Sequence, residues 1–232
     1  MVDGTVLVTG GTGGLGVAVT EELAAAGWRV VATALPRQAE IAPAETRDGV
    51  EVVGADLTDP NLVDVVIGVA TGRPRSPLRA VVNLVGGYAG GPRVHETPVE
   101  DFERQLTLNL RPAFLVSRAA LPHLVEAGGG SVVYVSSRAA VQPFAGAAGY
   151  ITAKAAVLAF AQVVAVEYRT QGVRANTVLP SVIDTPANRT AQPQADHSKW
   201  VPPAEIARVI RFLCGEESAP TSGAAIPVYG RA

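Results

Sequence analysis

The feature that most constrains this chain is a regular alternation of short, β-branched runs with longer helical patterns. The runs predict strands at residues 5–8, 30–33, 50–53, 79–85, 131–135, 173–179 and 224–228. The patterns between them predict helices at residues 15–26, 61–70, 100–125, 148–169 and 203–214. Nearly continuous apolar strands are typical of a parallel sheet that helices cover on both faces. The sequence therefore predicts an α/β fold with a doubly wound parallel sheet.

Composition indicates one domain. The chain has 232 residues, of which 48% are apolar and 17% are charged, and its formal net charge is −2. This length suits a single α/β domain, residues 1–232, better than two domains. The low, balanced charge excludes a disordered chain and a basic arm for nucleic acid.

Neither a membrane span nor a metal site is predicted. The longest apolar run, residues 155–166, is interrupted by Gln162 and is shorter than the ~20 residues that a bilayer requires. The N-terminus has no cationic targeting segment. Cys214 is the single cysteine, and the three histidines show no metal-ligand spacing. We therefore expect a cytoplasmic protein that binds no metal, membrane or nucleic acid.

A glycine cluster at residues 9–16 lies between the first predicted strand and the first helix. Glycines let a backbone turn sharply and approach phosphates, and a helix N-terminus offers free N–H groups to an anion. Two frames fit such a loop: Gly11, Gly13 and Gly16, or Gly10, Gly14 and Gly16. The cluster favours a dinucleotide site, and the alternative is a glycine-rich turn without a ligand.

The residues after the second strand bear on the choice of cofactor. An acid there would bind the ribose of NAD, but residues 34–36 carry none and Arg37 is the next charge. We therefore expect NADP(H) to be favoured over NAD(H), with Arg37 near the extra phosphate; the alternative is that Arg37 is a solvated surface charge. Asp56, after the third strand, is predicted either to accept from the adenine amino group or to cap the following helix.

Tyr150 and Lys154 are four residues apart at the start of a predicted helix, so they share one face. A nearby ammonium lowers the pKa of a phenol, which suits Tyr150 as a general acid or base on a carbonyl or hydroxyl oxygen. Ser136 and Ser137 end the fifth strand, where a hydroxyl can hydrogen-bond the same substrate oxygen. The alternative is an aromatic ring packed on the aliphatic stem of a lysine.

With these motifs, the sequence resembles the short-chain dehydrogenase/reductase family over essentially its whole length. The family loop T-G-x-x-x-G-x-G matches Thr9, Gly10, Gly14 and Gly16, and Y-x-x-x-K matches Tyr150 and Lys154. The resemblance implies a Rossmann fold with about seven parallel strands. It also implies a catalytic set of Asn109, Ser137, Tyr150 and Lys154. The cofactor-binding residues it implies, besides Tyr150 and Lys154, are Thr9, Gly10, Thr12, Gly14, Leu15, Gly16, Asp56, Leu57, Asn83, Gly86, Pro180, Ile183 and Thr185.

The resemblance also implies roles for the catalytic set. Tyr150 would donate the proton, Ser137 would position the substrate oxygen, and Lys154 would hold the cofactor ribose and lower the pKa of Tyr150. Asn109 would hold a water that extends a proton relay to Lys154. Pro112 follows three residues later and predicts a kink in the helix 100–125, because proline lacks an N–H group. The alternative is that Asn109 only hydrogen-bonds inside the core.

Two motifs depart from the family pattern. The usual N-N-A-G is present as residues 83–86 with only Asn83 and Gly86 retained, and the usual P-G is present as Pro180 followed by Ser181. The first change removes an asparagine that mostly supports the sheet. The second leaves the family roles of Ile183 and Thr185 in place.

Residues 187–202, rich in Gln, Asn, Pro and Thr, predict a variable surface loop near the substrate, in which Trp200 either covers a substrate or anchors the loop. The helix at 155–166 is apolar nearly all round, which predicts a homotetramer or homodimer. The predicted function is hydride transfer between NADP(H) or NAD(H) and a small-molecule ketone or secondary alcohol. The alternative is a catalytically idle dinucleotide-binding regulatory or scaffold protein on the same fold.

Overall fold

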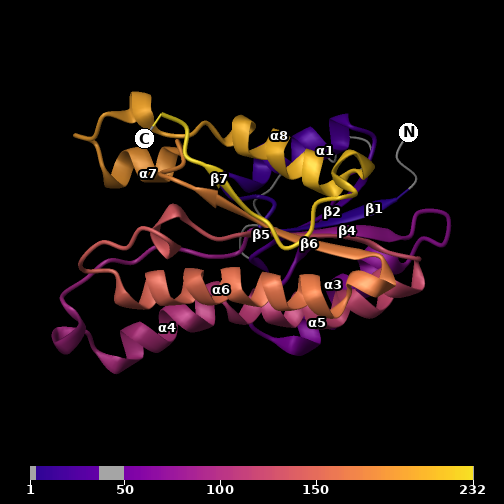
Figure 1. Ribbon diagram of the computed structural model, residues 1–232, viewed down its shortest axis with the longest axis horizontal. Helices are drawn as coiled ribbons and strands as arrows, with labels where there is room; N and C mark the ends of the chain where they lie inside the picture. The colour runs from indigo at the N-terminus through magenta and orange to yellow at the C-terminus, as the bar shows by residue number, and fades with distance from the viewer. Residues whose placement is uncertain (1–3, 37–49, 232) are drawn as a thin grey trace.

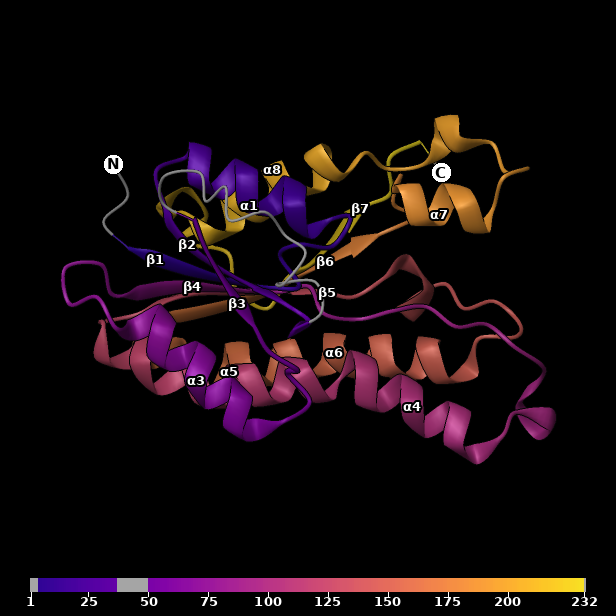
Figure 2. The ribbon, with the colours of Figure 1, turned by 180° about the vertical axis from the view of Figure 1, so that it is seen from behind.

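The computed structural model describes residues 4–36 and 50–231. Within them, seven strands form one parallel sheet in the order β3-β2-β1-β4-β5-β6-β7 (Figures 1 and 2). The strands are β1 (Thr5–Thr9), β2 (Arg29–Ala34), β3 (Val50–Gly54), β4 (Leu78–Asn83), β5 (Gly130–Val135), β6 (Val173–Pro180) and β7 (Ala225–Val228). The prediction of a Rossmann-type, doubly wound parallel sheet is confirmed.

Helices cover both faces of the sheet (Figures 1 and 2). One face carries α1 (Gly16–Ala25) and α8 (Pro203–Cys214), and the other carries α3 (Pro60–Thr71), α5 (Arg111–Glu126) and α6 (Ala148–Glu167), with α4 (Val99–Asn109) against α6. Because successive side chains of a strand point to opposite faces, Leu7 packs in one core while Val6 and Val8 pack in the other. Burial on both faces explains why β1 is apolar without alternation.

The strand order reverses beside β1. The chain runs outward through β2 and β3 and then returns to form β4 on the other side of β1. Ligands of such sheets bind outside the carboxyl ends of the strands at this switch point. The glycine cluster after β1, the polar end of β4 and the two serines after β5 all lie at that edge.

The long helix predicted at 100–125 is two helices. α4 ends at Asn109 and α5 begins at Arg111, with Leu110 between them. The predicted kink is therefore present, and it lies at Leu110, two residues before Pro112. Pro112 itself lies in the first turn of α5. Proline fits this position because the first residues of a helix need no N–H partner.

The prediction of an irregular loop at residues 187–202 is wrong in part. A short helix, α7 (Pro186–Ala191), opens the segment, and the Thr185 hydroxyl accepts the Asn188 N–H at 3.2 Å. Trp200 is buried, and its ring lies 4.3 Å from that of His197, centroid to centroid. Of the two predicted roles, covering a substrate or anchoring the loop, the burial of Trp200 fits anchoring.

Helix α6 is long and apolar enough to cross a membrane by length and composition alone. In the fold its inner side chains, including Val157, Ala161 and Val164, are buried against the sheet, and α4 packs beside it. This is the pattern of a core helix in a globular domain.

Candidate functional site

The glycine turn between β1 and α1 is shaped by its own backbone. Gly10 has a φ of 67°, and its N–H donates to the Thr33 hydroxyl at 3.0 Å. A Cβ on Gly16 would lie 2.1 Å from the carbonyl oxygen of Gly10, so no side chain fits there. The turn therefore brings bare backbone to the N-terminus of α1, with Thr12 and Leu15 in the same segment.

Gly14, the middle glycine of the predicted frame Gly10, Gly14 and Gly16, faces the segment after β6. A Cβ on Gly14 would lie 2.8 Å from Cγ2 of Thr185. Beyond it, Ile183 pairs with Val201, and its carbonyl accepts the Asn188 side-chain amide at 2.8 Å. The structure thus brings Thr185 to the glycine turn, while Pro180 ends β6 and Ile183 lies in the connection from β6 to α7.

Thr9 and Asn83 end the adjacent strands β1 and β4, and their side chains differ in whether they find hydrogen-bond partners. The buried Thr9 hydroxyl accepts the N–H of Leu84 at 3.0 Å, so it joins the two strands. Asn83 is also buried, yet both polar atoms of its side chain lack a hydrogen-bond partner among the described residues. Because buried polar groups are normally paired, this amide marks a place for a polar ligand.

Asp56 lies in the turn after β3 and accepts from the backbone N–H and the hydroxyl of Thr58, at 2.9 and 2.8 Å. The alternative prediction that Asp56 caps the next helix is wrong, because Asp59 caps α3 by accepting the N–H of Asn61 at 2.8 Å. The Leu57 side chain is buried in the core, so only its backbone could face a cofactor. Arg37 lies outside the described residues.

The two serines after β5 divide their tasks. Ser136 is buried and donates to the carbonyl oxygen of Lys154 at 2.7 Å, which fixes α6 to the end of the strand. Ser137 lies close enough to Tyr150 to lower the pKa of its phenol, and the Ser137 hydroxyl accepts the N–H of Ala139 at 3.1 Å. The geometry therefore brings Ser137 to Tyr150, as predicted, and leaves Ser136 in a structural contact.

Burial sets the pKa of the two ionisable side chains on α6. It raises the pKa of Tyr150 above its usual value of 10.0, against the hydrogen bond from Ser137, which lowers it. This direction is opposite to the one predicted from Lys154, because desolvation outweighs the other influences. Lys154 is buried too, its Nζ donates to the Val135 carbonyl at 3.1 Å, and burial lowers its pKa from 10.5 to about 8.

Asn109 and Lys154 meet at Gly86. A Cβ on Gly86 would lie 2.6 Å from Oδ1 of Asn109 and 2.9 Å from Nζ of Lys154. Oδ1 accepts the N–H of Gly87 at 3.1 Å, and Nδ2 donates to the Gly87 carbonyl at 3.0 Å. Asn109 thus makes the core hydrogen bonds of the alternative reading and also lies next to Lys154.

Sequence reasoning did not single out Gln105. It and Asn109 are the two buried residues of α4, and both are polar. Nδ2 of Asn109 donates to the Gln105 backbone carbonyl at 3.1 Å and to its Oε1 at 3.3 Å. Two polar residues at i and i+4 on the buried face of an amphipathic helix are the signal that could have found this pair.

Tyr88 and Phe144 were not singled out either. The Tyr88 ring meets the Tyr150 ring edge to face, with centroids 5.1 Å apart, and the Phe144 ring lies 6.4 Å from that of Tyr88. An aromatic residue just after a glycine pair at the end of β4 is the weak sequence signal of this contact.

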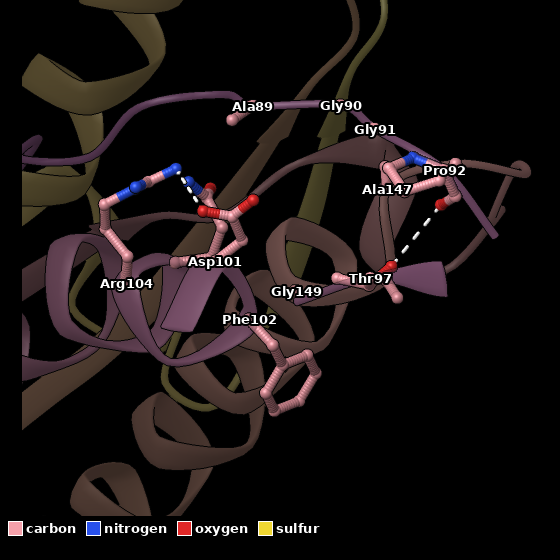
Figure 3. A pocket seen from close by; sticks show the side chains of 13 residues that line it. Ala89, Gly90, Gly91, Pro92, Thr97, Asp101, Phe102, Arg104, Ala147 and Gly149 are labelled. Carbon is pink, nitrogen blue, oxygen red and sulfur yellow. Dashed lines mark hydrogen bonds and ion pairs between the residues drawn. The ribbon is translucent and has the colours of Figure 1, made fainter. Parts of the chain in front are cut away.

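A small cavity lies beside the first turns of α4 and α6 (Figure 3). Its volume is about 60 Å³, which admits water but not a dinucleotide. Its wall includes Gly90 and Gly91 on one side and the Asp101–Arg104 ion pair, 2.8 Å, on the other. Across the described part of the chain, no group of three or more His, Cys, Asp or Glu residues could hold a metal ion.

These features fit a dinucleotide at the switch point. The glycine turn gives close backbone approach, the side chain of Asn83 has unpaired polar atoms, and Gly86 leaves room above Asn109 and Lys154. The polar groups converge where the fold places ligands of this kind.

Comparison with known proteins agrees. The family model for short chain dehydrogenases matches residues 4–196. A 2-(R)-hydroxypropyl-CoM dehydrogenase of Xanthobacter autotrophicus is 33% identical, over 97% of this chain and 96% of that protein. The 3-oxoacyl-(acyl-carrier-protein) reductase MabA of Mycobacterium tuberculosis is 32% identical, over 99% and 92%. A short-chain type dehydrogenase/reductase from Mycobacterium ulcerans has a TM-score of 0.88 at 26% identity, over 99% and 89% of the two chains. The chain therefore belongs to the short-chain dehydrogenase/reductase family and is an NAD(P)-dependent oxidoreductase.

Proposed function

We propose that this single-domain enzyme interconverts a small-molecule ketone and a secondary alcohol, with Ser137, Tyr150, Lys154 and Asn109 as its catalytic set. The observation that carries the proposal is the position of the Ser137 hydroxyl beside the Tyr150 phenol, whose pKa it lowers, at the carboxyl end of β5. It holds two hydroxyl groups side by side, which suits recognition of one carbonyl oxygen.

Tyr150 is the proton donor in the reducing direction. Its raised pKa keeps the phenol protonated at neutral pH, which suits a general acid. The Ser137 hydroxyl donates a hydrogen bond to the same substrate oxygen and orients it. The bound nicotinamide cofactor supplies or accepts the hydride.

Lys154 and Asn109 assist Tyr150 by helping to replace the proton that it donates. With a pKa lowered to about 8, Lys154 still carries its proton at pH 7 but releases it more readily than an exposed lysine. Asn109 holds the backbone of Gly87 beside Lys154, at distances of 3.1 and 3.0 Å. Together they form a path along which a proton lost by Tyr150 is replaced.

A cofactor groove is formed by the residues predicted at the outset. The glycine turn, from Thr9 to Gly16, holds the pyrophosphate, and Asn83 and Gly86 border the ribose beside Lys154. Asp56, Leu57, Pro180, Ile183 and Thr185 complete the groove through side chain or backbone.

The test is NAD(P)H oxidation with a panel of carbonyl compounds. We expect turnover of ketones. Tight cofactor binding without turnover of any carbonyl or alcohol would instead support the scaffold function. The panel includes acetoacetyl thioesters, because one relative is a 3-oxoacyl-(acyl-carrier-protein) reductase.

NADPH is favoured over NADH by roughly five- to tenfold, as one exposed arginine is worth only about 1 kcal/mol. After β2 come Ala34 and Leu35, neither of which repels a phosphate on the ribose. Arg37 follows in the sequence and supplies the cation. The measurement is Kd for both cofactors with the parent and Arg37→Ala, and equal affinities in the parent would contradict the preference.

The protein acts in the cytoplasm as a homotetramer or homodimer. Phe114 of α5 and Val163 and Val166 of α6 are exposed at 46%, 49% and 77%. Such an apolar surface on neighbouring helices suits a second copy of the chain. Light scattering at micromolar concentration checks this, and a monomeric mass would contradict it.

A further inference from the structure

Two solvent-exposed aromatic side chains extend from the Tyr150 ring: Tyr88 lies against it, and Phe144 lies against Tyr88. Tyr88 follows β4, and Phe144 lies in the connection from β5 to α6; they are 60% and 51% exposed. Val141, on the same connection as Phe144, is 47% exposed. Large apolar side chains are seldom left exposed together unless a ligand or partner covers them.

The Tyr88 ring is held in place. It meets the Tyr150 ring at 87°, with centroids 5.1 Å apart, in the edge-to-face arrangement that aromatic pairs prefer. At its other end, a Cβ on Gly90 would lie 2.4 Å from the Tyr88 hydroxyl oxygen. The ring therefore occupies the space that the missing side chain of Gly90 leaves free.

The two connections that carry these rings are joined. Gly91 N–H donates to the Gly146 carbonyl at 2.7 Å, and Figure 3 shows Gly91 and Pro92 passing beside Ala147. The rings of Tyr88 and Phe144, one on each connection, have centroids 6.4 Å apart and are tilted by 48° to each other. We call Tyr88 and Phe144 the aromatic wall.

Charged groups close to the site in sequence already have partners. The Arg138 guanidinium lies 5.1 Å from the ring centroid of Tyr229, and its Nε donates to Gln142 at 2.7 Å. Asp184 is paired with Arg189, whose Nη2 donates to it at 2.8 Å. The aromatic wall thus offers apolar contact, and the neighbouring charges are engaged elsewhere.

We propose that the aromatic wall selects ketones and secondary alcohols whose larger substituent is an uncharged ring. A flat ring covers Tyr88 and Phe144 while the oxygen lies between Ser137 and Tyr150. A linear chain covers less of two tilted rings and loses more rotational freedom on binding. This inference rests on the proposed function and adds the class of substrate.

The test compares acetophenone with the linear methyl ketone of the same carbon number. The readout is the ratio of kcat/KM for the two ketones, because a general loss of structure or of cofactor binding lowers both values and leaves the ratio unchanged. We expect the parent to favour acetophenone by about tenfold, as one aromatic contact allows. Tyr88→Ala removes most of that preference, and Tyr88→Phe keeps it.

Neighbouring glycines provide a second, independent pair of variants. In Gly90→Ala the new Cβ meets the end of the Tyr88 ring and displaces it, so the ratio falls as in Tyr88→Ala. In Gly91→Ala the new Cβ meets nothing within 4 Å, and the backbone N–H to Gly146 is kept, so the ratio is that of the parent. Thermal melting confirms that each variant is folded, and Tyr88→Ala decides the question if Gly90→Ala does not fold.

Three results would overturn the aromatic wall: a parent that reduces both ketones equally, one that reduces only linear or charged carbonyls, or a ratio that Tyr88→Ala leaves unchanged. In each of them carbonyl reduction persists, so the proposed function survives. A parent that turns over no carbonyl or alcohol removes the proposed function and, with it, this inference.

Discussion

The two ends of the sheet use polar groups in opposite ways. At the amino end of the strands lies the larger of the two cavities described here, about 790 Å³, with Arg79, Arg174 and Arg211 in its wall. Their hydrogen bonds complete other elements. Arg79 donates to the Ala127 carbonyl at the end of α5, and Arg174 donates to Leu213 and Gly215 at the end of α8, at 3.2 and 3.0 Å. Arginines there satisfy carbonyls that a helix C-terminus leaves unpaired.

At the carboxyl end the polar groups are left incomplete. Among the described residues, Asn83 is buried with both side-chain polar atoms unpaired, and the buried Lys154 ammonium donates to one backbone carbonyl, that of Val135. The exposed ring of Tyr88 adjoins Tyr150 at the same end. Cavity size and charge therefore do not locate this site. In the part of the chain that the structure describes, buried unpaired side-chain atoms occur at Asn83 and at Nε of Arg29, which begins β2 at the amino end. The other two nitrogens of Arg29 donate to protein oxygens, whereas Asn83 has no partner for either polar atom, which costs stability unless a ligand completes it.

Among the expected effects, the largest is a loss of kcat on substitution of Tyr150, at the carboxyl end of the sheet. Tyr150→Phe removes one hydroxyl from the carboxyl end and should lower kcat by about 10²–10⁴-fold, the usual contribution of a general acid. Cofactor affinity and thermal stability should stay close to those of the parent. Steady-state kinetics and cofactor titration measure both, and a variant within threefold of the parent rate would remove Tyr150 from the mechanism.

The next effect is on stability and depends on pH. Between pH 8 and 10.5 the unfolded chain keeps the Lys154 proton and the folded protein loses it, so unfolding becomes harder as pH rises. Below pH 8 the cost of the buried charge is present in full, up to about 3 kcal/mol. Lys154→Met should therefore be more stable than the parent at pH 7 while losing turnover.

Urea unfolding of Lys154→Met and the parent at pH 7 and pH 10 checks this. The other titratable groups are shared, so the difference between the two proteins isolates Lys154. The stability advantage of the variant should shrink at pH 10. An advantage that is the same at both pH values would show that Lys154 is not a strained buried cation.

At the amino end, Arg174→Met should cost about 2 kcal/mol of stability, because several carbonyl oxygens lose their donor. The folded variant should keep its kcat, since the change is at the opposite end of the sheet. Arg104→Met is the matched control, an exposed arginine paired with Asp101, and should change stability by less than about 0.5 kcal/mol. A loss of kcat in folded Arg174→Met would break the division between the two ends.

The smallest expected effect is a change in stability, which should have opposite signs at two buried asparagines. Asn83→Leu should stabilise the cofactor-free protein by about 1 kcal/mol and weaken NADPH binding, since it removes unpaired polar atoms. Asn176→Leu should destabilise, because Asn176 donates to Thr221 at 2.8 Å and accepts from Ala224 at 3.0 Å. Thermal melting with and without NADPH compares them. Equal losses of stability would mean that Asn83 is as well satisfied as Asn176.

Local sequence was sufficient for most of the elements. Unbroken β-branched runs predicted seven strands, because burial on both faces of the sheet leaves no alternation, and α8 has the predicted bounds. The helix boundaries that were predicted wrongly depend on proline placement and capping hydrogen bonds rather than on hydrophobic pattern. Leu110 interrupts the predicted long helix, and α7 forms in a segment without hydrophobic periodicity because Thr185 caps it.

Within the proposed site, the sequence by itself determined the candidate residues: the glycine turn, Ser137, Tyr150 with Lys154 one turn later, and Asn109. These follow from spacing along single elements, which the sequence contains. Only the tertiary structure decided how they are tuned. It bound Ser136 to the Lys154 carbonyl, brought Tyr88 onto the Tyr150 ring, and reversed the predicted direction of the Tyr150 pKa shift. Desolvation and ring contacts depend on segments far apart in the chain, and no local pattern records them.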